Sequence, residues 1–71
     1  MVKVSRGRCL LQDWLDLKGM SQAELSRRTG YAARMISFYC SGSRPMSTSA
    51  MYIISRVLGI HMEDLYEWKM K

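Results

Sequence analysis

Apolar side chains recur every three or four residues in several stretches of the chain, which is the spacing of an amphipathic helix. The pattern predicts helices at about residues 8–17, 22–29, 32–40 and 48–58. A fifth helix is expected after His61, because the acidic residues that follow it would suit the positive end of a helix dipole. The chain therefore reads as five short helices.

The segment from Ser21 to Gly42 has the pattern of two short helices around a tight turn. Ser21 is a favourable N-cap, and Glu24 three residues later can complete a capping box. Gly30 tolerates the left-handed conformation at a helix end, and Gly42 can end the second helix in the same way. Such a pair forms a helix-turn-helix unit, whose second helix can enter the major groove of DNA.

The motif SQAEL, the Gly that follows it, Ile36 and the loop SGSRP together resemble the DNA-binding domains of phage repressors and Cro-like (Xre-type) bacterial regulators. The resemblance covers about residues 9–65. It implies an all-α, compact five-helix, lambda-repressor-like domain at residues 8–71 that binds operator DNA, usually as a homodimer. Residues 1–7 are expected to form a flexible basic arm before this domain.

The second helix of the pair is the one that reads DNA in the resembling family. With Ile36 and Tyr39 turned inward, its outward residues are Ala33, Arg34, Ser37 and Phe38. The resemblance matches Ala33, Arg34 and Phe38 to base-reading positions. Arg34 could pair with guanine, and the apolar side chains could touch thymine methyl groups. Phe38 could instead be partly buried core, and Arg34 could instead be a solvated surface residue.

The resemblance also implies phosphate contacts around this helix. It places Gln22 in the first turn of the preceding helix, where free N–H groups favour an anion. Ala32 stands at the N-cap, where Ser or Thr is more usual, so a cap of about 1 kcal/mol is missing. Ser43 and Arg44 lie in the following loop. A solvated Gln and an ordinary polar turn are the simpler alternatives.

Two further expectations concern charges. Arg6 and Arg8 could reach DNA from the arm or remain in water. In many members of the resembling family an Arg and a Glu form an internal ion pair where this chain has Leu15 and Cys40. Apolar contact is expected to replace that pair. The chain has only two cysteines, Cys9 and Cys40, and we expect both to be free thiols in a reducing cytoplasm.

The C-terminal part of the chain is unusually apolar for its length. Self-association is one interpretation of this surface, and the folding of Tyr66 and Trp68 onto their own core is the other. The candidate residues are Ile53, Val57, Tyr66 and Trp68.

Composition narrows the class of function. The 71 residues carry a net charge of +5, which favours a polyanionic partner, nucleic acid before an anionic membrane surface. No apolar run reaches the roughly 20 residues of a membrane helix, and no secretory signal is apparent. Neither a phosphate loop, a zinc-spaced set nor an activated nucleophile is found, so we expect no enzyme, cofactor or metal.

Three functions remain open. The leading hypothesis is a sequence-specific regulator that binds double-stranded DNA in a phage or bacterium and represses by occupying an operator. The alternative is a protein-interaction module with the same fold, such as an antitoxin or an anti-repressor partner. A third is an architectural protein that binds DNA without sequence preference. A steep fall of affinity with salt would distinguish DNA binding from protein binding. A preference for selected over random duplexes would distinguish the sequence-specific regulator from the architectural protein.

Overall fold

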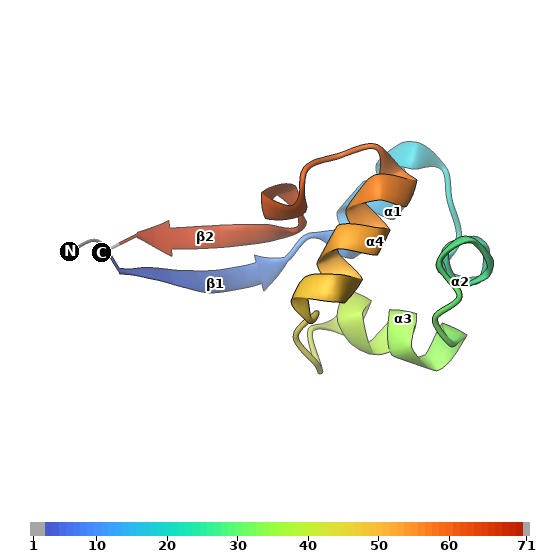
Figure 1. Ribbon diagram of the computed structural model, residues 1–71, viewed down its shortest axis with the longest axis horizontal. Helices are drawn as coiled ribbons and strands as arrows, with labels where there is room; N and C mark the ends of the chain where they lie inside the picture. Colours follow the sequence, from blue (N-terminus) through green and yellow to red (C-terminus); the bar gives the residue numbers. More distant parts are fainter. Residues whose placement is uncertain (1–2, 71) are drawn as a thin grey trace.

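The computed structural model describes residues 3–70, which form four α-helices and one two-stranded antiparallel sheet (Figure 1). The elements are strand β1 (Val4–Cys9), helices α1 (Leu11–Lys18), α2 (Gln22–Thr29), α3 (Ala33–Ser41) and α4 (Thr48–Leu58), the 3₁₀ turn η1 (Met62–Leu65) and strand β2 (Tyr66–Met70). None of the described helices has the length and apolar character needed to cross a membrane.

The two ends of the chain correct the predicted all-α, five-helix fold. The basic arm expected at residues 1–7 is wrong for its described part, because β1 begins at Val4 and pairs with β2. Residues 1–2 lie outside the described part. The fifth helix is also wrong: a single 3₁₀ turn, η1, leads directly into extended backbone at Tyr66. The helix-favouring residues after His61 form only one turn, and this is not enough to outweigh the pairing of β1 with β2.

The sheet projects from the helical body as a ribbon, which lengthens the molecule to 40 × 21 × 19 Å (Figure 1). Val4, Ser5 and Arg6 pair with Met70, Lys69 and Trp68, and the register then shifts by a bulge in β1. Gly7 lies in this irregular part, where an added Cβ would come within 2.7 Å of the Glu67 carbonyl oxygen. Glycine is therefore required by the close approach of the two strands.

The core lies between the helices, and Leu65 and Tyr66 add to it from the C-terminal side. Trp14 is half-buried against this core and donates a hydrogen bond from Nε1 to the Asp64 carbonyl oxygen at 2.7 Å. Leu17, which shares the apolar pattern of α1, is 74% exposed. The fully buried large side chains are Leu11, Leu15, Leu25, Ile36, Met46, Ile54 and Leu65.

Capping residues set the helix boundaries close to the predicted ones. The Ser21 hydroxyl accepts a hydrogen bond from the Glu24 amide, and the Ser47 hydroxyl accepts one from the Ala50 amide. Each cap satisfies one of the N–H groups that a helix leaves free at its start. Helix α1 begins at Leu11 rather than at Arg8, because β1 takes the preceding residues.

Candidate DNA-binding surface

The turn between α2 and α3 is fixed by side-chain hydrogen bonds. Gly30 adopts the left-handed conformation there, with φ 83°. The Ser26 hydroxyl donates to the Tyr31 carbonyl oxygen at 2.6 Å, and the Thr29 hydroxyl donates to the Leu25 carbonyl oxygen at 2.8 Å. The first bond ties the turn to α2 and the second closes the last turn of α2, so both fix the backbone that leads into α3.

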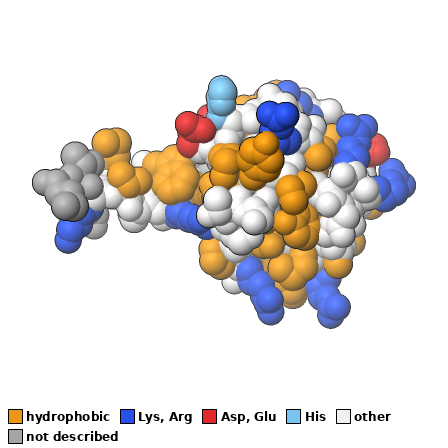
Figure 2. Space-filling model, viewed as in Figure 1, with side chains coloured by type: hydrophobic (Ala, Val, Ile, Leu, Met, Phe, Trp, Pro, Cys, Tyr) orange, Lys and Arg blue, Asp and Glu red, His pale blue; other side chains and the backbone are white. Residues whose placement is uncertain are grey.

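Helix α3 presents the outward face that its sequence predicts. Ala33, Arg34 and Ser37 are exposed, whereas Ile36 and Tyr39 are buried. Within residues 3–70 the Arg34 side chain makes no hydrogen bond or ion pair, so its guanidinium is available to a ligand. Figure 2 shows basic side chains protruding from the lower edge of the molecule, where α3 lies in Figure 1.

The N-terminus of α3 has no side-chain cap. Ala32 has the extended conformation of an N-cap residue, with φ −60° and ψ 144°, but its methyl group accepts no hydrogen bond. The first N–H groups of α3 therefore lack the capping partner that Ser21 provides in α2. Free N–H groups at a helix start attract anions such as phosphate. Ala32 itself contributes backbone rather than side-chain chemistry at this position.

Phe38 and Arg44 form one unit at the end of α3. The Arg44 guanidinium lies 5.0 Å from the centroid of the Phe38 ring, within the range of a cation–π contact. The amides of Ser43 and Arg44 both donate to the Phe38 carbonyl oxygen, at 3.0 and 3.4 Å. Phe38 is half-buried. Its exposure therefore lies between the two alternatives that the sequence left open, an exposed base-reading residue and a partly buried core residue.

The loop after α3 is ordered by its own hydrogen bonds. The hydroxyl groups of Ser41 and Ser43 lie 2.8 Å apart, and the Ser43 amide is 3.3 Å from the Ser41 hydroxyl. Ser43 and Arg44 both remain exposed. The structure thus places the two predicted phosphate contacts of this loop beside the outward face of α3.

Gln22 lies in the first turn of α2, as expected, and is held by a partner that the sequence analysis missed. Its Nε2 donates to Gln12 Oε1 at 2.8 Å, and Gln12 Nε2 donates to Asp16 Oδ1 at 2.9 Å. This chain of amides orients Gln22 before any ligand binds. Gln12 stands at an ordinary polar position of α1, so no sequence signal singled it out.

Arg6 is anchored within the protein. Its Nη1 donates to the Met46 carbonyl oxygen at 2.7 Å, and its guanidinium lies 4.9 Å from the Tyr66 ring centroid. Arg8 lies 3.2 Å from a carboxylate oxygen of Asp13 and 3.7 Å from one of Glu67. Both residues belong to β1, so the structure does not support a mobile arm that carries them to DNA.

Tyr66 is buried in the protein's own core rather than available for the self-association that the sequence allowed. The side chain is only 7% exposed, and its hydroxyl accepts a hydrogen bond from the Met46 amide at 2.9 Å. Tyr66 is therefore part of the core, as the alternative interpretation held. The other candidates keep some exposed surface: Trp68 is 39% exposed, Ile53 is 37% exposed and Val57 is half-buried.

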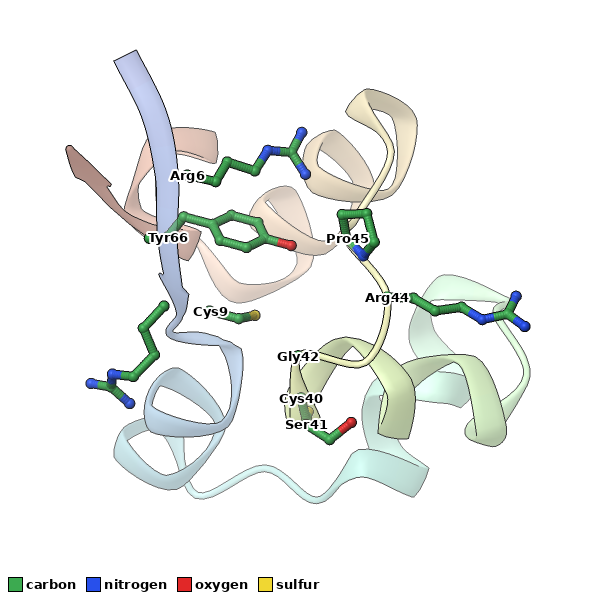
Figure 3. A pocket seen from close by; sticks show the side chains of 10 residues that line it. Arg6, Cys9, Cys40, Ser41, Gly42, Arg44, Pro45 and Tyr66 are labelled. Carbon is green, nitrogen blue, oxygen red and sulfur yellow. The ribbon is translucent and has the colours of Figure 1, made fainter. Parts of the chain in front are cut away.

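A hollow of about 460 Å³ separates β1 from the end of α3 and the loop that follows it. Figure 3 shows Tyr66 reaching across it toward Pro45, with Cys9 nearby and Arg44 pointing away. Burial is the main cause that raises the pKa of the Cys40 thiol to about 11, and the neighbouring Cys9 and Asp16 make smaller contributions. Burial also raises the pKa of Cys9. The raised pKa values leave both thiols with less of the reactive thiolate at neutral pH than an ordinary cysteine has.

The family comparison agrees with this geometry. The HTH_3 family model, described as a helix-turn-helix, matches residues 11–65. This chain belongs to the Cro/C1-type (Xre) helix-turn-helix family. Membership implies DNA binding and transcriptional regulation, and the family is typically non-enzymatic. The matched segment spans α1 to η1 and leaves both strands outside. No curated protein matches the chain.

Proposed function

We propose that this protein is a transcriptional regulator that reads a specific double-stranded DNA sequence and represses by occupying an operator, as a homodimer. The observation that carries this proposal is the outward face of α3, on which Arg34, with no ion-pair partner among residues 3–70, stands between small exposed side chains. A helix with small residues beside one guanidinium can approach the base edges closely.

Base recognition is assigned to Arg34, with Ala33, Ser37 and Phe38 beside it. Arginine forms two parallel hydrogen bonds with guanine O6 and N7, the commonest specific contact in the major groove. Ala33 is exposed and can meet a thymine methyl group, and the Ser37 hydroxyl can bond a base edge. Phe38, which is half-buried, would contribute its accessible part, with the Arg44 guanidinium lying over its ring.

Phosphate binding is assigned to groups on both sides of α3. Arg44 and Ser43 follow the helix, and the uncapped N–H groups after Ala32 precede it. Gln22 adds an oriented amide at the start of α2. Contacts of this kind set the register on the duplex and provide most of the affinity, whereas base contacts select the sequence.

Selection of binding sites from a random duplex pool, at two salt concentrations, tests this function. A sequence-specific regulator should enrich one short motif at both salt concentrations, with affinity that falls steeply as salt rises. Binding without enrichment would favour an architectural role. Absence of binding at low salt would overturn the proposal and favour the protein-interaction alternative.

A further inference from the structure

Both main-chain polar groups of Met46 are held by side chains from the two strands of the sheet. The Arg6 guanidinium in β1 donates from Nη1 to the Met46 carbonyl oxygen at 2.7 Å, and the Tyr66 hydroxyl in β2 accepts from the Met46 amide at 2.9 Å. Met46 is itself only 1% exposed. It is therefore a fixed point at which the sheet meets the segment between α3 and α4.

The two side chains that hold Met46 also contact each other. The Arg6 guanidinium lies 4.9 Å from the centroid of the Tyr66 ring, within the range of a cation–π contact. Figure 3 shows the two side chains next to each other on the same side of the hollow. They are brought together by the pairing of β1 with β2, in which Arg6 lies opposite Trp68. The hold on Met46 therefore depends on the paired sheet.

The opposite end of the same segment is fixed to α3. The amides of Ser43 and Arg44 both donate to the Phe38 carbonyl oxygen, at 3.0 and 3.4 Å. Only Pro45 separates Arg44 from Met46. The proline ring fixes its own φ and disfavours helical conformations of the residue before it. Arg44 is therefore placed between two anchors, one on α3 and one on the sheet.

We propose that Arg6 and Tyr66 are positioning residues for DNA binding, which act through Met46 to hold Arg44 in place for a phosphate. Neither has to touch the duplex: Tyr66 is 7% exposed, and the Arg6 guanidinium is engaged by Met46 and by the Tyr66 ring. An arginine that is held before binding loses less conformational freedom when it meets its ligand, so its affinity is higher. This role rests on the proposed function, in which Arg44 is assigned to a phosphate.

Amide hydrogen exchange of the full chain without DNA tests whether the segment is held. Arg6→Met and Tyr66→Phe each remove one of the two bonds to Met46. In either variant the Met46 amide should exchange about tenfold faster or more, relative to amides inside α4, because local opening becomes easier. Tyr52→Phe is the matched control, since it removes a hydroxyl from an exposed side chain and should leave this exchange unchanged. Unchanged exchange in Arg6→Met and Tyr66→Phe would overturn the inference.

Titration with DNA tests the consequence for binding. With the fluorescent duplex of highest affinity from the random pool, Arg6→Met and Tyr66→Phe should each weaken binding by about three- to tenfold, as for residues coupled in one network. Affinity is expressed per folded molecule, with the folded fraction taken from circular dichroism. Tyr66→Phe keeps the ring and the charge, so it carries the test if Arg6→Met does not fold. Unchanged affinity in either folded variant would overturn the role of that residue.

Arg56→Met is the matched control for Arg6→Met in this titration. Arg56 is exposed, lies in the last turn of α4 and has its guanidinium 5.8 Å from the centroid of the Tyr52 ring. The change removes the same charge and the same kind of ring contact, at the end of α4 that lies away from α3 (Figure 1). Affinity should stay within about twofold of the wild type, because salt screens a distant exposed charge. An equal loss in Arg56→Met and Arg6→Met would reduce the effect of Arg6 to net charge and overturn its positioning role.

A double-mutant cycle with Arg44→Ala distinguishes positioning from direct contact. If Arg6 acts through Arg44, Arg6→Met should weaken binding by less than about twofold in a chain that already lacks the Arg44 side chain. The same holds for Tyr66→Phe. If Arg6 bound a phosphate itself, as the sequence allowed, the losses from Arg6→Met and Arg44→Ala would multiply. Losses that multiply would therefore overturn the inference.

The two measurements separate this inference from the proposed function. A wild type that bound no duplex, with faster exchange in both variants, would overturn the proposed function and leave the hold on Met46 intact. A wild type that bound the duplex, with exchange and affinity unchanged in both variants, would overturn the positioning role and leave DNA binding intact.

Discussion

The guanidinium of Arg44 lies 5.0 Å from the centroid of the Phe38 ring, so the loop after α3 is joined to the proposed reading helix by a cation–π contact. The backbone supports the same arrangement, because the Arg44 amide is bonded to the Phe38 carbonyl oxygen. The positive charge is held beside α3, where it can form an ion pair with a phosphate that flanks the major groove.

Arg44→Ala should lower affinity for all duplexes by a similar factor. One phosphate contact fewer should reduce the slope of log K against log salt by about one unit. Fluorescence anisotropy at several salt concentrations measures both. Arg44→Lys is the control, because it retains the charge and therefore most of the slope. A loss confined to particular sequences would mean that Arg44 contacts a base.

Arg34→Ala should weaken binding to the selected site by about 1–3 kcal/mol and relax the choice of base at one position. The reason is the loss of a two-pronged hydrogen bond that lysine cannot reproduce. Site selection with the wild type, Arg34→Ala and Arg34→Lys measures it. Equal weakening on every sequence would assign Arg34 to a phosphate instead.

Tyr66→Phe should destabilise the fold by about 1–3 kcal/mol, because the buried Met46 amide loses its hydrogen-bond acceptor. Urea denaturation measures the change in the free energy of unfolding. Tyr52→Phe removes the same hydroxyl from a residue that is 53% exposed, and it should change stability by less than about 0.5 kcal/mol. Equal effects of the two substitutions would contradict the role of Tyr66 as an anchor.

Stability should fall as the pH rises from 9 toward 11, in part because of Cys40. Its pKa is about 11 in the folded chain against 9.0 for an ordinary thiol, so the folded state keeps a proton that the unfolded state releases. The contribution is complete below pH 9 and is lost as the pH passes through 11. Cys40→Ala removes this titration, so the free energy of unfolding of the variant should fall less than that of the wild type between pH 9 and 11. Urea denaturation at each pH measures it. Equal falls in the wild type and the variant would contradict the raised pKa.

Local signals were sufficient for the central helices. Ser21, Gly30 and Gly42 set the boundaries of α2 and α3 to within one residue, because caps and left-handed glycines act on the backbone next to them. The exposure of Arg34 and the burial of Ile36 followed from helical periodicity alone. The outward face of the candidate site was thus predictable, although the ring of Phe38 proved half-buried.

The partners of these side chains were not predictable from neighbouring residues. Arg6 bonds Met46, forty positions away, and Gln22 bonds Gln12 across two helices. Such contacts exist only once the helices have packed. Sequence position alone could not show that Arg6 is anchored rather than free.

By itself the sequence determined the helix-turn-helix and the outward face of its second helix, since each depends on residues within one or two turns. Tertiary structure decided the sheet, because a strand forms where a partner strand meets it. The alternation of Tyr66, Trp68 and Met70 was a strand signal, but a turn of acidic residues before it suggested a helix. Pairing of β2 with β1, from the opposite end of the chain, settled the conformation in favour of the strand.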